Sequence, residues 1–301
     1  MTTWLRTIVG ACGELFIDTL IRVCGRRYAP REVTWLRGPI GGATIGDRPY
    51  EEIARAEHLS VERLATTGGL LPDFEVLASA SFDPGQVDAK IRDFYENTAR
   101  YQLDTWATTF FPARIALWLL VATISRRVQQ LDLPLDGLDT AKGITSEIIL
   151  LRDPTGAVRY TGWFRRRVHD GRVLFTGFYM TQRIPRDDLP CVKAVFPMPD
   201  GNATVVLRPV NDGTGFCLTS VGTGFGDAGF YRVQRSGDGI RVWRVAHLHD
   251  TFRLYVDQEG CVRGDHEIRF LGVGVITLHY RMAPRSASAL VAHSGDGGAP
   301  R

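Results

Sequence analysis

The hydrophobic pattern of this 301-residue chain changes near residue 142, and that change restricts the fold more than any single motif does. Before it, apolar residues recur every three or four positions, which is the period of an α-helix. After it, short apolar or alternating segments follow one another and are closed by turn sequences such as Asp170-Gly171, Asp212-Gly213 and Glu259-Gly260. Short alternating segments joined by tight turns are typical of an antiparallel meander.

The second half of the chain is therefore predicted to form one large sheet. Strands are expected at 145–151, 157–166, 172–182, 191–197, 203–209, 215–221, 229–235, 240–248, 252–257, 261–270 and 273–282. A meander of this length tends to curl, close or split, because closure removes unpaired edges. The predicted fold class is α+β: N-terminal helices packed on a β-barrel or curved half-barrel, lipocalin-like in general shape. The predicted boundaries are 1–142 for the helical region that packs on or caps the sheet, 143–283 for the barrel-like domain and 284–301 for a disordered tail.

Four helices are expected in the first half. An amphipathic helix spans 4–23, and a second spans 49–64. A third has Asp83 as its cap and Pro84 at its first position, where the missing N–H costs nothing. A fourth runs from 112 to 131, and because its centre is apolar on every side it is interpreted as a buried helix or a plug across the open end of the sheet. The first helix is expected to dock on the protein body, with a lid, a homodimer contact or a helix on a membrane surface as the alternatives.

Composition limits the class of partner. The chain has 36 basic and 33 acidic residues, a balance that argues against nucleic-acid binding. Lys90, Lys142 and Lys193 are the only lysines among the basic residues, and arginine anchors anions but is a poor proton shuttle. Five scattered cysteines without a CxxC pair favour a reduced, cytoplasmic protein. Charges interrupt the apolar N-terminal stretch, so neither a signal peptide nor stable membrane insertion is expected.

Four of the seven histidines fall between residues 247 and 279, and this is the one concentration of groups suited to proton transfer. Strand alternation places His266 on an apolar and presumed inward face, with Val262, Ile268 and Phe270. A general acid–base role is predicted for His266, with His279 and His247 as further catalytic candidates. Two other interpretations stay open: hydrogen-bonded histidines without chemistry, and a metal site built on the i, i+2 pair His247 and His249. No metal or cofactor is included in the predicted function.

The glycine-rich run 224–229 has the GxGxxG spacing of a dinucleotide-binding loop. Such a loop requires a following helix, whose N-terminal amides meet the pyrophosphate. Here the sequence that follows, from Phe230 to Val233, has strand character, so a loop or bulged corner is expected instead.

Aromatic side chains on the predicted strands are candidates for lining a cavity, because tyrosine and tryptophan combine an apolar ring with one polar atom. The candidate ligand-binding residues are Trp163, Phe178, Tyr179, Tyr160, Tyr231 and the carboxylate Glu147. Core packing is the competing interpretation for most of them. The triple arginine 165–167 is interpreted as a solvated edge.

Three functions follow from a large curved sheet without a nucleophile motif. In the first, the cavity binds an apolar, oxygenated small molecule and promotes a cofactor-independent cyclisation or isomerisation of the natural-product type, which depends on shape, oriented donors and exclusion of water. In the second, the cavity carries a lipid or other apolar ligand without chemistry. In the third, the sheet is a protein-interaction scaffold with no pocket. The first is preferred.

Overall fold

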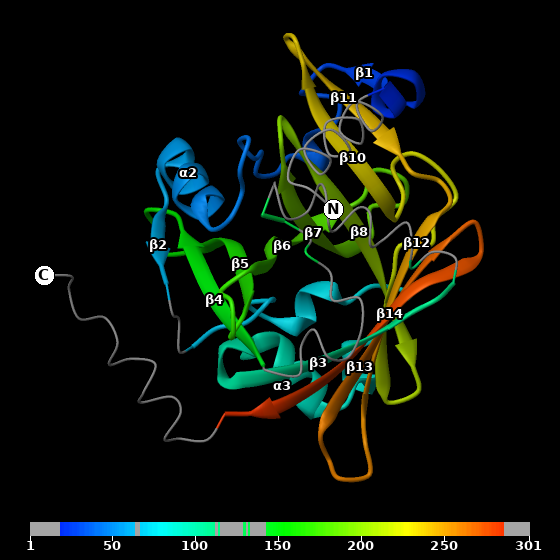
Figure 1. The fold of residues 1–301 in the computed structure, drawn as a ribbon. Helices are drawn as coiled ribbons and strands as arrows, with labels where there is room; N and C mark the ends of the chain where they lie inside the picture. The colour runs from blue at the N-terminus through cyan, green and yellow to red at the C-terminus, as the bar shows by residue number, and fades with distance from the viewer. Residues whose placement is uncertain are drawn as a thin grey trace, which may run out of the picture.

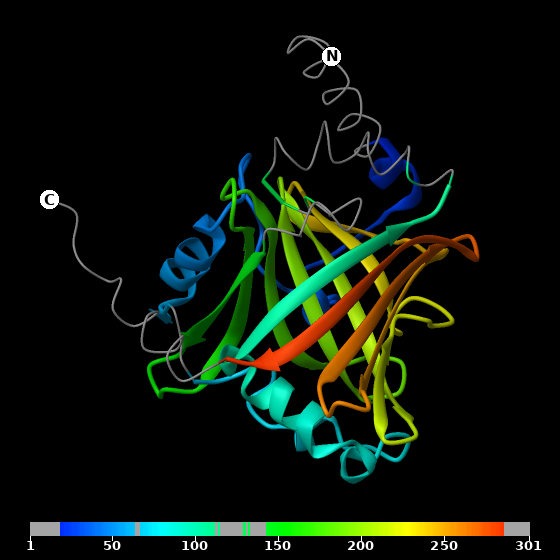
Figure 2. The same ribbon diagram turned by 60° about the horizontal axis from the view of Figure 1, so that its bottom comes forward.

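The computed structural model describes residues 19–63, 67–111, 114, 129–130, 132 and 143–285. In this part of the chain, fourteen strands belong to one strongly curved sheet (Figures 1 and 2). The strands are β1 (Arg26–Tyr28), β2 (Ser60–Glu62), β3 (Tyr101–Thr109), β4 (Ile144–Arg152), β5 (Val158–Arg167), β6 (Val173–Arg183), β7 (Pro190–Met198), β8 (Gly201–Asp212), β9 (Gly215–Thr219), β10 (Gly229–Ser236), β11 (Gly239–Arg244), β12 (Leu248–Val256), β13 (Val262–Phe270) and β14 (Val273–Pro284). The helices are α2 (Arg48–Glu57), α3 (Ala89–Glu96) and the short 3-10 turns η1 (Thr34–Leu36), η2 (Phe74–Leu77), η3 (Pro84–Gln86) and η4 (Thr98–Arg100).

The strand order is β2-β4-β5-β6-β7-β8-β9-β12-β13-β14-β3, and every neighbouring pair is antiparallel. Strands β10, β11 and β1 branch from β8 as a side extension. Short loops connect most neighbours, as the turn sequences predicted. The strands at both ends of the order, β2 and β3, come from the first half of the chain.

The sheet does not close, so the predicted barrel and the lipocalin-like shape are wrong, while the alternative of a curved sheet is confirmed. No hydrogen-bonded ladder joins β3 to β4, although the two strands approach each other. The guanidinium of Arg285 bridges the seam: its Nε donates to the carbonyl of Tyr101, 3.1 Å away, and its Nη2 donates to the carbonyl of Ser146, 2.7 Å away. A side chain therefore replaces backbone pairing at this edge.

The strand predictions for the second half agree with the structure to within a few residues at most ends. The first half differs more, because it supplies β1, β2 and β3, which were not predicted, to the same sheet as the second half. Strand β3 has period-2 burial, with Tyr101, Leu103, Thr105 and Ala107 facing inward. That alternation reflects its place in the sheet as the partner of β14.

The predicted helices have mixed outcomes. The helix expected at 49–64 is α2, which ends at Glu57 because His58 adopts a left-handed conformation. Asp83 and Pro84 begin only the short turn η3, and the following α-helix α3 is capped separately by Asp88, whose carboxylate accepts from the N–H of Lys90 at 2.8 Å. The helix expected at 112–131, most of the helix at 4–23 and the tail from 286 onward lie outside the described residues.

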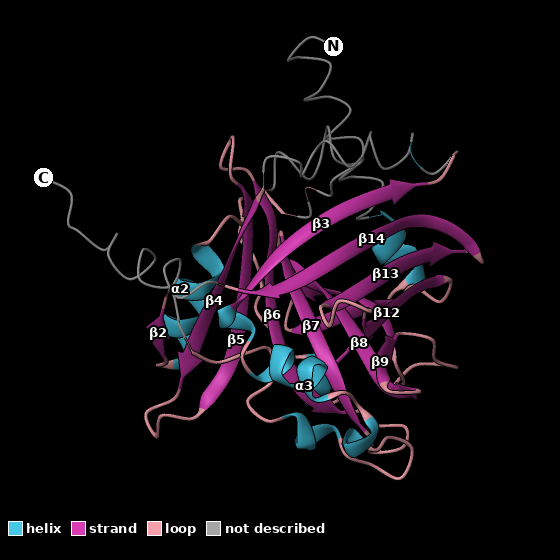
Figure 3. Ribbon diagram, turned by 90° about the horizontal axis from the view of Figure 1, so that it is seen from below, coloured by secondary structure: helices cyan, strands magenta, loops and turns pink. Residues whose placement is uncertain are grey.

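Three clusters of buried apolar side chains hold the sheet. The largest fills much of the concave side, where α3 and η2 cover one end of the curve (Figures 2 and 3). Ile91, Phe94 and Tyr95 of α3 point into it, at the helical spacing that places them on one face. On the convex side, α2 packs on β4, β5 and β6 through Tyr50 and Ala54, while the segment around η1 packs on β10 and β11. Both faces of the central strands are thus covered.

Candidate functional site

The concave face of the sheet contains a pocket of about 80 Å³ beside the core of the α3 end. Its apolar wall includes Val192, Val205 and Leu218 from β7, β8 and β9, and Tyr95 of α3 contributes to its boundary. Polar groups converge on it from β5, β6, β12, β13 and β14: Arg165, Tyr179, Asp250, His266 and Tyr280. A largely apolar hollow with a few converging polar groups is the usual form of a small-molecule site.

Arg165 is a buried cation in this pocket, with 6% of its surface exposed. Its guanidinium carbon lies 4.3 Å from the ring centroid of Trp163 and 4.3 Å from that of Phe175, so both rings stabilise the charge by cation–π contact. Among the described residues no carboxylate forms an ion pair with it, and its buried Nε has no hydrogen-bond partner there.

Two tyrosine hydroxyls share the pocket with this cation. Burial raises the pKa of Tyr179 to about 12, against the opposing effect of Arg165. Burial likewise raises the pKa of Tyr280, again against the opposing effect of the nearby Arg165. Both phenols are therefore protonated at neutral pH and can donate hydrogen bonds to a ligand oxygen. The ring of Trp163 is fixed beside them, because its Nε1–H donates to the hydroxyl of Ser146 at 2.7 Å.

Asp250 and His266 form a carboxylate–imidazole pair at the pocket. They occupy diagonal positions on the same face of β12 and β13, where Phe252 is the direct partner of His266. The imidazole Nε2 is hydrogen-bonded to a carboxylate oxygen of Asp250. The backbone of Asp250 is fixed in turn, since its N–H donates to the buried hydroxyl of Ser220 at 2.7 Å. With Nε2 engaged, Nδ1 is the nitrogen of His266 left to exchange a proton with a ligand.

The structure does not bring the histidine cluster together. His266 lies on the concave face, as strand alternation predicted, but His279 lies on the convex face, where its Nδ1 is 2.6 Å from a carboxylate oxygen of Asp265. His247 is exposed in the connection between β11 and β12. Neither lines the pocket. Within the described ranges, no three histidine, cysteine or acidic side chains are placed to bind one metal ion.

The predicted ligand-binding residues divide between the two faces of the sheet. Trp163 and Tyr179 line the pocket, whereas Phe178 and Tyr160 pack under α2 on the convex side. The hydroxyl of Tyr160 donates to the carboxylate of Glu57 at 3.0 Å. Glu147 also faces the convex side, 3.7 Å from the guanidinium of Arg63.

Tyr231 belongs to the cluster around η1 rather than to the pocket. Its ring meets that of Trp35 edge-on, with centroids 5.0 Å apart, and its hydroxyl donates to the carbonyl of Asp227 at 2.6 Å.

Sequence reasoning missed Arg165, Asp250 and Tyr280, and it wrongly assigned the triple arginine to a solvated edge. Arg166 is exposed, but Arg165 and Arg167 are buried. The signal was present, because Arg165 is two residues from Trp163 on the same strand and so shares its face. The position of Asp250 beside His266 depends on the register in which β12 pairs with β13, and that register is visible only in the structure.

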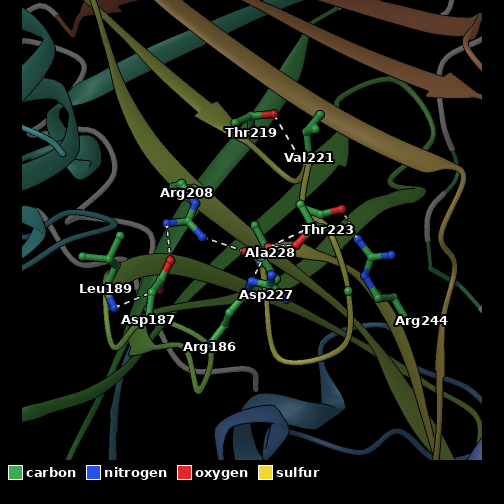
Figure 4. A network of polar contacts seen from close by, with 12 residues as sticks. Arg186, Asp187, Leu189, Arg208, Thr219, Val221, Thr223, Asp227, Ala228 and Arg244 are labelled. Atoms are coloured by element: carbon green, nitrogen blue, oxygen red, sulfur yellow. Dashed lines mark hydrogen bonds and ion pairs between the residues drawn. The ribbon is translucent and has the colours of Figure 1, made fainter.

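The glycine-rich run 224–229 forms a loop that leads into β10, so no helix follows it. Asp227 anchors this loop (Figure 4): its carboxylate accepts from Arg208 at 2.6 Å, from the N–H of Thr223 at 2.9 Å and from its neighbour Ala228 at 2.7 Å. Burial by itself would raise the pKa of Asp227, but these hydrogen bonds outweigh it and lower the pKa to about 2. The loop is thus explained by its internal contacts.

A second hollow, of about 470 Å³, lies on the convex side between α2, η1 and β7. Its lining includes the exposed charged side chains of Arg37, Glu57 and Arg159. Its buried cation, Lys193, donates to the carbonyls of Trp35 and Arg37 at 3.0 and 2.8 Å and to Gln182 at 3.4 Å. Because the ammonium is already fully partnered, the concave pocket is the stronger candidate site.

Comparison with known proteins gives one informative match. The chain is 25% identical over 233 residues to the uncharacterized membrane protein YndJ of Bacillus subtilis (strain 168). The match covers 74% of this chain but 39% of that protein, so the chain spans about two fifths of the length of this relative. No family matches the chain, and no solved structure matches it.

This similarity bears on localisation. The scattered cysteines predicted a cytoplasmic protein, and the similarity to a protein named as a membrane protein contradicts that prediction. Among the residues that the structure describes, none of the helices combines the length and the apolar character needed to span a bilayer.

Proposed function

We propose that the concave pocket binds an apolar, oxygenated small molecule and promotes its cofactor-independent isomerisation or cyclisation. The observation that carries the proposal is the Asp250–His266 pair in a pocket whose other walls are largely apolar. A carboxylate that orients an imidazole beside a dry binding site is a recurring arrangement for general acid–base catalysis.

The chemistry assigned to the site is a proton shift. His266 removes a proton from a carbon next to a carbonyl, and the electron pair moves onto the carbonyl oxygen. The protonated hydroxyls of Tyr179 and Tyr280 donate hydrogen bonds to that oxygen as its charge develops. For isomerisation, the imidazolium then returns the proton to another carbon. For cyclisation, the enolate carbon attacks a second carbonyl carbon of the same molecule, the C–O π electrons of that carbonyl move onto its oxygen, and this oxygen takes the proton from the imidazolium. Asp250 stabilises the imidazolium between the two steps.

The size of the pocket limits the part of the substrate that fits. A buried water requires about 10–15 Å³ of comparable space. A pocket of about 80 Å³ thus has room for roughly five to eight groups of the size of a water molecule. The reacting portion of the substrate is therefore small, and a longer polyene or polyketide would project from the pocket.

The test is turnover of small β,γ-unsaturated ketones to their conjugated isomers, followed by ultraviolet absorbance, with polyketide-like diketones as cyclisation probes. His266→Gln is expected to lower the protein-dependent rate about 100-fold or more, the scale of a lost general base, while binding of the ketone persists. His279→Gln is the matched control, since that imidazole also pairs with an aspartate but lies on the opposite face. An undiminished rate in the His266 variant contradicts the assignment, and probes that react no faster with protein than without it contradict the enzyme proposal.

A non-catalytic carrier of a lipid or other apolar ligand is the second candidate. The apolar wall of the pocket favours it, as does the similarity to a protein named as a membrane protein. Ligand binding without turnover, unaffected by His266→Gln, would support the carrier over the enzyme.

A further inference from the structure

We infer that Arg165 selects the chemical class of the ligand: an apolar molecule that carries a carboxylate or an equivalent anionic group. This inference rests on the proposed function, because it takes the concave pocket as a ligand site. The polar end of the ligand is then an anionic group, and Arg165, which lies outside the acid–base pair, binds it.

The charge of Arg165 is not balanced by a carboxylate of the described residues. A buried cation is costly unless an anion or several hydrogen bonds compensate it. Only 6% of the surface of Arg165 is exposed, yet no acidic side chain of the described residues forms an ion pair with it. Asp250, the carboxylate that lines the pocket with it, is engaged by His266. The cation is therefore left with its charge directed at the cavity.

Arg167, two residues along the same strand, is a second buried arginine with a different set of partners. Its exposure is similar, but its guanidinium pairs with Asp132 at 3.2 Å and with Asp170 at 3.1 Å. Among the described residues, carboxylates therefore pair with one buried arginine of β5 and not with the other. The difference between them is that Arg165 lines the pocket.

The two aromatic contacts of Arg165 do not use its hydrogen-bond donors. The guanidinium carbon lies 4.3 Å from the ring centroids of Trp163 and Phe175, and such cation–π contacts leave N–H groups able to donate. The buried Nε of Arg165 has no partner among the described residues. A guanidinium is planar, and its N–H groups can donate to the two oxygens of a carboxylate. The apolar side chains of β7, β8 and β9 then receive the hydrocarbon part of the molecule.

The experiment compares acids with amides of the same shape. Hexanoate and benzoate are titrated against hexanamide and benzamide by calorimetry at neutral pH, with the whole chain. The wild-type protein is expected to bind each acid at least tenfold more tightly than its amide, the scale of a charge-assisted hydrogen bond in a desolvated site. Arg165→Gln is expected to reduce that ratio to about one while changing amide affinity less than about threefold. Arg165→Lys keeps the charge without the planar fork and is expected to retain only part of the preference.

Arg166→Gln is the matched control, because it removes a neighbouring positive charge from the exposed side of the same strand. Its acid-to-amide ratio is expected to equal that of wild type. If acids and amides bind the wild-type protein equally, or if Arg165→Gln keeps the preference, the inference is overturned while the proposed function stands. If no probe binds at all, the proposed function itself fails. The wild-type comparison needs no variant, so a folding defect of Arg165→Gln would not remove the test.

Discussion

Lys193 and Arg165 are both buried basic residues on strands of the sheet, but their hydrogen-bond partners differ. The ammonium of Lys193 has three oxygen acceptors, whereas the Nε of Arg165 has no partner in the described part of the chain. The packing contacts of Lys193 therefore account for its burial. An unpartnered Nε alone does not mark a ligand contact, because the Nε of Arg167 also lacks a partner. Arg165 differs from Arg167 in that it lines the pocket and has no carboxylate partner among the described residues.

The stability of the protein is expected to rise between about pH 8 and pH 10 because of Lys193. Burial lowers the pKa of its ammonium to about 8, whereas the unfolded chain keeps the ordinary value of 10.5. In this window the unfolded state binds more protons than the folded state, so raising the pH favours folding. Lys193→Met should abolish the gain, which amounts to a few kcal/mol. Urea unfolding at several pH values measures it.

Lys90→Met is the control for this prediction, because Lys90 is exposed and donates only to the carbonyl of Gly260. Its pH dependence should match that of wild type. Equal slopes for the wild-type protein and the Lys193 variant would show that the buried ammonium does not titrate in this range.

At the scale of elements, the β13–β14 hairpin carries local strain. Its two-residue loop is Leu271-Gly272, and both residues have positive φ, at 53° and 80°. Type I′ hairpin turns require this geometry and favour Asn-Gly. A leucine in the left-handed region costs roughly 1–2 kcal/mol. The side chain of Leu271 is 63% exposed and so recovers little of this through burial.

Leu271→Asn is therefore expected to stabilise the protein by about 1 kcal/mol, because asparagine tolerates the left-handed region. Thermal unfolding should show a rise of a few degrees. Leu271→Ala removes the same apolar surface but keeps the backbone strain, so it should give no comparable rise. An equal gain in both variants would attribute the effect to the lost leucine side chain rather than to the turn.

At the scale of the whole molecule, the open seam between β3 and β4 determines the shape of the sheet. The carbonyl groups of Tyr101 and Ser146 accept hydrogen bonds from Arg285 across this seam. The bridge joins the end of the described chain to β3 and β4. It also fixes the backbone of Ser146, whose hydroxyl holds the pocket residue Trp163.

Arg285→Gln is expected to lower the free energy of unfolding by about 1–3 kcal/mol, because two half-buried carbonyls lose charge-assisted donors. Hydrogen exchange of the β3 amides should accelerate more than that of the central strands. Arg281→Gln provides the control, since its ion pair with Asp104, at 3.5 Å, is exposed and contributes little. If the two variants lose the same stability, the seam does not depend on Arg285.

Much of the fold could be predicted from local pattern, and the exceptions have identifiable causes. The strands from β4 to β14 follow from alternation and turn residues, which are properties of neighbouring positions. Strand β3 carries the same alternation, in Tyr101, Leu103 and Ala107, but stood among helical segments and was missed. The candidate site was predicted in part: the inward face of His266, and the pocket positions of Trp163 and Tyr179. Five other candidates were selected by residue type, which does not specify the face of the sheet on which a side chain lies: Phe178, Tyr160, Tyr231, Glu147 and His279.

The sequence by itself determined which segments of the second half become strands, where most of them turn and which side chains alternate along each, because these depend on contacts between near neighbours. Tertiary structure alone decided that the sheet stays open, that β2 and β3 flank it, and that Arg165, Asp250 and His266 meet in one pocket. Those outcomes depend on register and curvature accumulated over many strands, and on burial that depends on every neighbour at once.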